Sequence, residues 1–146
     1  MAKQKINPNQ SNYQSYRCHV GRTATQSLST GNNIVMMNSK LYDPSNMYNT
    51  GTGEVQFPET GVYRVSIRIS AGNVRLFPQI SQTQPYEQSY RGTDYLANGS
   101  GSSGFLSVDI MAVKGQYMLP IVYSSGSTTT EGTTETYWMT VQFVGA

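Results

Sequence analysis

The sequence predicts an all-β fold, and three observations support this fold class. Apolar and polar residues alternate with a period of two in several short segments, as they do in strands with one buried face. Turn-forming Gly, Pro, Asn and Ser residues separate these segments. No stretch shows the 3.6-residue apolar period of an amphipathic helix. Short strands at regular spacing, with glycine-rich turns between them, favour a β-sandwich or a barrel.

The composition is that of a folded domain with few charges. The 146 residues are enough for one domain with its own apolar core. Charged residues make up only 12% of the chain, which also contains 11 tyrosines. Disorder in a polar chain normally comes with high net charge and few aromatic residues, so this composition indicates β-structure with long polar loops. The net charge is +2 and the ten basic residues are scattered, which argues against a nucleic-acid-binding surface.

The first residues differ from the rest of the chain. Residues 1–15 lack apolar periodicity and are rich in Asn, Gln and Ser. We interpret them as a flexible arm, either a disordered tail or a docking segment, and residues 16–146 as the folded domain. No apolar run follows Lys3 and Lys5, so the sequence predicts neither a secretion signal nor a membrane span. We therefore expect a chain made and kept in solution in a cytoplasm, unless it is cut from a longer one.

Three segments predict half-buried strands most clearly. Residues 63–70 alternate between an apolar face that begins at Tyr63 and a polar face that begins at Arg64. Residues 105–112 and 137–144 follow the same pattern. Turns are expected between the strands, at residues 49–53, 58–61, 70–73, 98–104, 114–115 and 124–134.

Two further strands are expected to be apolar on both faces. Residues 74–80 and 117–123 contain Pro78 and Pro120, and prolines suit edge strands because they lack a backbone N–H. A strand with two apolar faces is either enclosed within the fold or covered by another subunit. Because a small sandwich has only one interior, burial between subunits is the favoured interpretation.

Residues 39–66, with the sequence SKLYDPSNMYNTGTGEVQFPETGVYRVS, resemble the central signature of C1q-like globular domains of the C1q/tumour-necrosis-factor superfamily. That signature combines Tyr-Asn or Tyr-Asp, Thr-Gly, a strand containing Phe, and Pro-x-x-Gly-x-Tyr. Its positions are occupied here by Tyr48, Asn49, Thr52, Gly53, Phe57, Pro58, Gly61 and Tyr63. A looser similarity extends over residues 17–146, with a strand pair around Lys114 and Gly115 and a final core strand. The resemblance implies a jelly-roll β-sandwich that assembles as a homotrimer.

The trimer would bury apolar side chains from the two-faced strands and the last strand. The expected interface residues are Phe77, Met118, Val122, Tyr123 and Trp138.

The resemblance also suggests a setting for this domain. The animal proteins combine the domain with a collagen stalk and a secretion signal, whereas this sequence has no Gly-X-Y tract. A jelly roll with a short polar arm is similar to C1q-like domains of phage virions and bacterial surface filaments. The implied function is a non-enzymatic virion structural protein, a capsid decoration or a head or tail fibre protein, attached to the larger assembly through residues 1–15.

The alternative is an adhesin of a phage tail or a bacterial surface that binds a glycan or a protein of the host. Tyr86, Tyr90 and Tyr95 lie in a polar segment and are the candidates for stacking on a sugar. They could equally lie along a strand and pack on its neighbours.

The sequence predicts no catalytic or metal site. Cys18 and His19 are adjacent, so an extended strand sends them to opposite faces and they cannot form a nucleophile–base pair. One cysteine and one histidine cannot supply the four ligands of a structural zinc ion. The eight acidic residues show neither paired spacing nor an EF-hand pattern, and Glu131 and Glu135 lie in a Thr- and Gly-rich loop. Calcium bound by loop oxygens stays open, because some C1q-like domains bind it.

Overall fold

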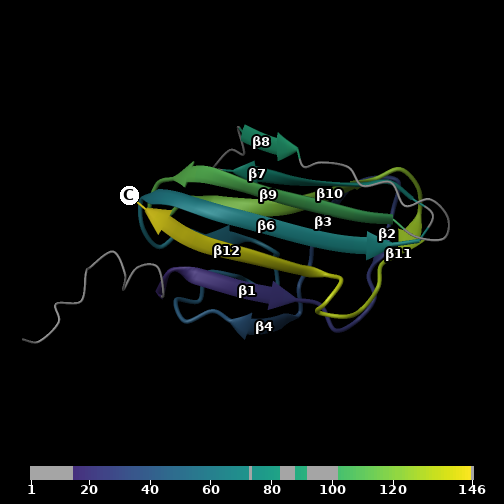
Figure 1. The fold of residues 1–146 in the computed structure, drawn as a ribbon, viewed down its shortest axis with the longest axis horizontal. Coiled ribbons are helices and arrows are strands. Elements are labelled where there is room, and N and C mark those ends of the chain that lie inside the picture. The colour runs from purple at the N-terminus through teal and green to yellow at the C-terminus, as the bar shows by residue number, and fades with distance from the viewer. Residues whose placement is uncertain (1–14, 73, 83–87, 92–101, 146) are drawn as a thin grey trace, which may run out of the picture.

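The computed structural model describes residues 15–72, 74–82, 88–91 and 102–145, and every element assigned within them is a strand. Figure 1 shows their arrangement. The strands are β1 (Arg17–Gly21), β2 (Ser27–Leu28), β3 (Gly31–Ile34), β4 (Ser39–Tyr42), β5 (Val55–Gln56), β6 (Gly61–Ala71), β7 (Leu76–Gln82), β8 (Gln88–Arg91), β9 (Ser102–Ala112), β10 (Tyr117–Ser124), β11 (Thr128–Thr129) and β12 (Trp138–Gly145).

Two antiparallel sheets form a sandwich. The first sheet has the strand order β4-β1-β12-β6-β9, and these strands lie side by side in Figure 1. The second has the order β3-β10-β7-β8, with β5 also paired to β10. A short ribbon of β2 and β11 lies at one end. The predicted all-β sandwich is therefore confirmed. No helix in the described residues is long and apolar enough to cross a membrane.

The alternating residues of β6 form the centre of the core. Tyr63, Val65, Ile67 and Ile69 are completely buried, while Arg64 points outward. Burying an aliphatic or aromatic side chain of this size stabilises the fold by roughly 1.5–3 kcal/mol. β6 pairs with β12 on one side and β9 on the other, and its buried side chains belong to the same core cluster as those of β7 and β10 in the second sheet. The strand predicted from residues 63–70 is therefore confirmed.

One face of each two-faced strand is enclosed by the chain's own core, and the other face is partly exposed. Met118 and Val122 of β10 have no exposed surface, and they face inward with Leu76 and Ile80 of β7. The prediction that Met118 and Val122 lie at a subunit interface is therefore wrong. Alternation with a period of two assigns the residues of a strand to two faces. Where both faces are apolar, it cannot show which one points into the core.

The prolines do not mark edge strands either, because β7 and β10 both have neighbours on two sides. Pro120 falls between the residues of β10 that pair with β5 and those that pair with β3. Its carbonyl oxygen accepts a hydrogen bond from the Val35 N–H on that side. In an antiparallel strand the N–H and C=O of one residue point the same way, so the missing donor faces this gap.

Gly61 is required by a close approach between strands. A Cβ atom at this position would lie 2.5 Å from both the Gly145 carbonyl oxygen and Cε2 of Phe143. Its φ of +157° is also outside the range that side chains favour. The glycine of the Pro-x-x-Gly-x-Tyr pattern thus lets the start of β6 lie directly against the end of β12.

Candidate binding surfaces

A polar cleft of about 400 Å³ opens between β4, β5 and the segment that connects them. We call it the edge cleft, because β4 is the last strand of the first sheet and β5 lies beside β10 in the second. Its lining residues are Lys40, Asn46, Met47, Tyr48, Asn49, Thr50, Thr52, Glu54, Gln56 and Tyr117.

The floor of the edge cleft is part of the core. Met47 and Tyr48 are both buried, at 3% and 1% exposed. The Tyr48 hydroxyl accepts a hydrogen bond from the Met37 N–H at 2.8 Å, which ties the floor to the segment after β3. Burial raises the pKa of Tyr48 to about 12, so its hydroxyl stays protonated at neutral pH.

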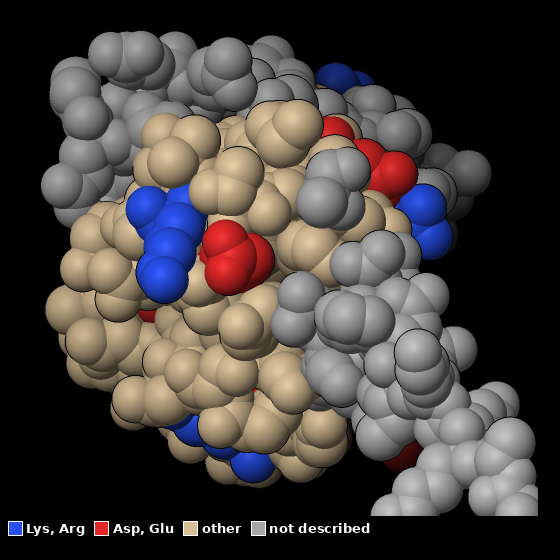
Figure 2. Space-filling model, turned by 90° about the vertical axis from the view of Figure 1, so that its left-hand side faces the viewer, with Lys and Arg blue, Asp and Glu red and all other residues tan. Residues whose placement is uncertain are grey.

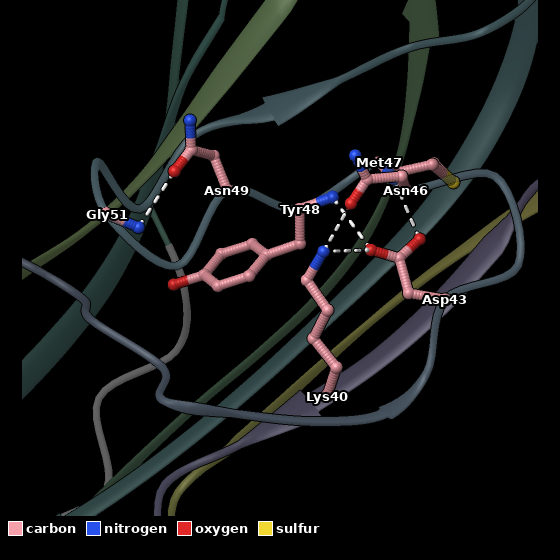
Figure 3. A network of polar contacts seen from close by, with 7 residues as sticks. All are labelled: Lys40, Asp43, Asn46, Met47, Tyr48, Asn49 and Gly51. Carbon is pink, nitrogen blue, oxygen red and sulfur yellow. Dashed lines mark hydrogen bonds and ion pairs between the residues drawn. The ribbon is translucent and has the colours of Figure 1, made fainter.

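Asp43 shapes one wall (Figure 3). Its carboxylate accepts hydrogen bonds from the backbone N–H groups of Met47, at 2.8 Å, and Tyr48, at 3.0 Å. It also forms an ion pair with Lys40 at 3.3 Å, although its own side chain is fully buried. Asn46 adopts a left-handed conformation with φ of 51°, which asparagine tolerates better than most residues. The sequence DPSN is typical of such a turn, because Asp suits its first position and Pro its second.

Asn49 shapes the opposite wall. Its side-chain oxygen accepts hydrogen bonds from the N–H groups of Gly51, at 2.8 Å, and Thr52, at 3.3 Å. Its backbone carbonyl accepts from Gly53, and its backbone N–H donates to the carbonyl of Glu54. The side-chain nitrogen points away from Gly51 (Figure 3) and donates no hydrogen bond within the described residues. The side-chain oxygen of Asn49 therefore holds the loop, while its side-chain nitrogen remains able to donate a hydrogen bond.

Gln56 and Tyr117 form the outer wall. They are directly opposite each other where β5 pairs with β10, so their side chains stand on one face as neighbours. Tyr117 is half-buried, which leaves part of its ring accessible from the cleft. The Gln56 side-chain nitrogen makes a long hydrogen bond of 3.4 Å to the Gly115 carbonyl oxygen.

A second feature is an aromatic patch on the outward face of the first sheet. Trp138, Arg68 and Phe105 are aligned across β12, β6 and β9 and line a hollow of about 270 Å³ together with Ser103. The Trp138 ring packs edge-on against Phe105, at 6.2 Å between centroids, and against His19, at 6.4 Å. Burial, and to a lesser extent the nearby Arg17, lowers the pKa of His19.

The middle of this face is polar. The hydroxyl groups of Ser66 and Ser107 share a hydrogen bond of 2.9 Å. Arg64 binds both oxygens of Asp109, at 2.9 and 3.2 Å. These hydrogen bonds and charges lower the pKa of Asp109 and raise that of Arg64, although both side chains are exposed. The face of the molecule in Figure 2 likewise shows positive and negative side chains interspersed among neutral ones.

The remaining residues of the predicted interface lie on opposite sides of the sandwich. Phe77 and Tyr123 pack together, at 5.8 Å between ring centroids, on the outward face of the second sheet. Trp138 lies on the outward face of the first sheet. These three residues therefore do not form one continuous surface.

The predicted sugar-contacting tyrosines are only partly accounted for. Tyr86 and Tyr95 lie outside the described residues. Tyr90 is on β8 opposite Ile80, but its side chain is outside the described part of the structure. The edge cleft was missed by sequence reasoning because Tyr117 is far from residues 40–56 in the chain. The only available signal was the Asn-, Thr- and Gly-rich stretch at residues 49–53, which we interpreted as a turn.

Cys18 and His19 lie on opposite faces of β1, as predicted. Cys18 is 2% exposed and burial raises its thiol pKa, so it stays a neutral thiol within the core. His19 is half-buried on the outward face. No group of three or more His, Cys, Asp and Glu side chains within the described residues could hold a metal ion.

Comparison with known proteins identifies the fold. No protein-family model and no curated protein matches the sequence. Solved structures do match. The Eiger TNF of S. frugiperda is 13% identical, covers 89% of this chain and 92% of its own, and gives a TM-score of 0.65. The globular domain of zebrafish complement 1qA is 15% identical, with 88% and 97% covered and a TM-score of 0.64.

Murine APRIL at pH 8.0 is 10% identical, with 88% and 98% covered and a TM-score of 0.66. At these identities the likeness concerns the fold. It agrees with the jelly roll implied by the signature at residues 39–66 and with the two-sheet topology. This chain therefore has the jelly-roll fold of TNF and C1q globular domains.

Proposed function

We propose that this protein is a non-enzymatic homotrimer that serves as a structural component of a virion, either decorating a capsid or forming part of a head or tail fibre. Three jelly rolls form the body of this trimer, and residues 1–15 attach it to the larger assembly. The virion setting rests on the resemblance of residues 39–66 to C1q-like domains and on the composition of the chain.

The observation that carries the trimer is the position of the exposed apolar side chains. Leu41 and Tyr42 of β4 are 49% and 39% exposed, and Met111 of β9 is 60% exposed, followed by Val113 at 53%. β4 and β9 are the two opposite edge strands of the first sheet.

Two different apolar edges on one chain suit a contact in which β4 of one copy meets β9 of the next. Such a contact joins unlike surfaces, and it closes into a ring when the rotation between copies allows it. Covering these side chains is favourable by about 25 cal/mol for each Å² of apolar surface removed from water. The C1q-like signature implies three copies in the ring.

The non-enzymatic character is supported by the position of the chain's best nucleophile. Cys18 points into the core and burial raises its pKa, whereas the one histidine, His19, is on the other face of β1. A thiol in this setting has neither the base nor the access that covalent catalysis needs.

Light scattering tests the assembly. The wild-type protein should have three times the 16.1 kDa mass of one chain at micromolar concentration. Met111→Asp should shift the population towards monomer, because it places a charge in the proposed contact. Tyr123→Asp is the matched control, since Tyr123 is 40% exposed on the other sheet. A wild-type monomer would rule out the proposal, and loss of the trimer in the control alone would move the contact to the second sheet.

The role of the arm has its own test. Deleting residues 1–15 should leave the trimer intact but abolish its loading onto particles of the virus that encodes it. Truncated protein that still loads onto particles would show that the arm is not the attachment segment.

An adhesin is the second candidate, and the edge cleft is the observation that favours it. A polar recess beside a partly exposed tyrosine suits a glycan of a host surface. In that case the trimer presents several copies of a weak site, and multivalency strengthens the attachment.

A further inference from the structure

We propose that the edge cleft binds a neutral saccharide, with one pyranose ring seated beside Tyr117. This inference rests on the adhesin candidate above and specifies its site and its class of ligand. It concerns residues that the sequence did not single out for binding.

The size and lining of the cleft suit a sugar. Small-molecule sites generally measure about 300–1,000 Å³, and the edge cleft has about 400 Å³. Sugar hydroxyls both donate and accept hydrogen bonds, and so do side-chain amides. The cleft offers the amides of Asn46, Asn49 and Gln56.

Several of these groups are held in place before any ligand arrives. The Asn49 side-chain oxygen is used by Gly51 and Thr52, which orients its nitrogen as a donor. The Gln56 side-chain nitrogen donates to the Gly115 carbonyl oxygen at 3.4 Å, which leaves the Gln56 side-chain oxygen as an acceptor. Binding groups fixed in this way lose little conformational entropy on binding, so a small polar ligand is bound more tightly.

The charges of the cleft favour a neutral ligand. Lys40 is the one basic residue among the described lining residues, and its ammonium group is paired with the buried carboxylate of Asp43 and bonded to the Asn46 side chain. The positive charge of Lys40 is therefore balanced by the Asp43 carboxylate. A sialic acid or a phosphate would therefore find no unbalanced cation among the described lining residues, whereas a neutral hexose needs none.

Tyr117 supplies the apolar surface that a pyranose needs. One face of a pyranose ring carries mainly C–H groups, and an aromatic ring with a polar tip can cover it. Tyr117 is partly accessible and stands next to Gln56, so ring contact and hydrogen bonding can act on the same sugar.

Two other interpretations are less favoured. A cation site would need clustered acidic side chains, and both oxygens of Asp43 are already occupied by backbone N–H groups. The aromatic patch around Trp138 also offers stacking surface, but among its described lining residues only Arg68, Ser103 and the Trp138 indole N–H are polar. The edge cleft therefore combines the two requirements of sugar recognition better than the aromatic patch.

The test is saturation-transfer NMR and titration with the full-length protein. The probes are the methyl glycosides of glucose, galactose, mannose and N-acetylglucosamine, with N-acetylneuraminic acid as the anionic probe. We expect saturable binding of at least one neutral probe, with a Kd on the order of 1 mM as is usual for a weak single-site contact. The anionic probe should bind more weakly than the best neutral one.

Variants locate the binding. Gln56→Ala and Tyr117→Leu should each weaken binding of the best probe by at least about tenfold, which corresponds to 1.4 kcal/mol. Tyr123→Leu, on the same strand, and Glu131→Gln, on an exposed loop, are the matched controls and should bind as the wild type does. Amide shifts of residues 46–56 on titration give a second measurement that does not depend on any variant.

Three results would overturn the inference. They are no saturable binding of any neutral probe, unchanged binding in both cleft variants, or tighter binding of N-acetylneuraminic acid than of every neutral probe. Light scattering on the same samples measures the mass of the assembly. A trimeric mass without saccharide binding would overturn the sugar site but not the proposed trimer.

Discussion

The hydroxyl of Tyr63 donates a hydrogen bond to the Glu59 carbonyl oxygen, at 2.6 Å, and accepts one from the N–H of the same residue, at 3.2 Å. Tyr63, a core residue of β6, thus pairs with both backbone polar groups of Glu59, which lies in the turn before β6. Its ring packs between Phe57 and Phe143, at 4.7 and 5.3 Å between centroids. The Pro-x-x-Gly-x-Tyr pattern therefore describes one physical unit, in which the tyrosine fastens the turn that the proline and glycine begin.

Removing this hydroxyl should destabilise the protein without changing its shape. Tyr63→Phe keeps the ring but leaves the Glu59 N–H and C=O without their partner, at a cost of about 1–3 kcal/mol. Urea unfolding gives the free energy directly. Tyr123→Phe, at an exposed position, should change it by less than about 0.5 kcal/mol. Equal effects of the two variants would show that the turn does not depend on Tyr63.

Gly53 should resist substitution for two separable reasons. It has φ of +81°, and a Cβ atom would lie 3.0 Å from Cγ2 of Ile34 and from the sulfur of Met36. The backbone conformation alone costs about 1–2 kcal/mol in Gly53→Ala. Gly115 has a similar φ of +88° with nothing within 4 Å of a Cβ, so Gly115→Ala measures that part alone. We expect Gly53→Ala to lower the free energy of unfolding more than its control, and equal values would contradict the predicted clash.

Met118 should behave as a core residue. Met118→Ala removes a fully buried side chain and should cost about 2–5 kcal/mol in the free energy of unfolding. It should reduce thermal stability at every protein concentration, since the lost contacts lie within one chain. A loss that vanishes on dilution to the monomer would instead return Met118 to a subunit interface.

The protein should lose stability in strong alkali before its tyrosines have all ionised. Burial raises the pKa of Tyr48 and of Tyr63 to about 12, against about 10 in an unfolded chain. A raised pKa means that this stabilisation is fully present below pH 10 and is lost as the pH rises towards 12. Thermal melts and tyrosinate absorbance across this range test the prediction. Ionisation of every tyrosine near pH 10 with the fold intact would contradict it.

His19 should make stability depend on pH in the acidic range. Burial and Arg17 lower its pKa, so the unfolded chain binds a proton more readily than the folded one. The stabilisation from neutral His19 is present above its unfolded pKa of about 6.5 and is lost as the pH falls below that value. His19→Gln should flatten the change in melting temperature between about pH 7.5 and 5. A variant with the same pH dependence as the wild type would assign the effect to other groups.

Local patterns predicted much of the fold. The strands at residues 63–70 and 137–144 and the opposite faces of Cys18 and His19 follow from side-chain alternation, and the turn at residues 114–115 follows from its Lys-Gly pair. Of the turn expected at residues 98–104, residues 102–104 instead belong to β9, and the others lie outside the described residues. The resemblance of residues 39–66 to C1q-like domains implied the jelly roll, which the topology confirms. The edge cleft could not be predicted in this way, because Tyr117 reaches Gln56 only through the pairing of β10 with β5.

The sequence by itself determined that this chain is all-β and poor in charge, since a period of two, turn-forming residues and composition are local properties. Only the tertiary structure decided which side of β10 is the core. Both sides are apolar, and the burial of Met118 and Val122 depends on how the second sheet packs against β6 and β12. The same packing leaves Tyr117 and Tyr123 facing outward, because residues on alternate positions of one strand must point to opposite faces.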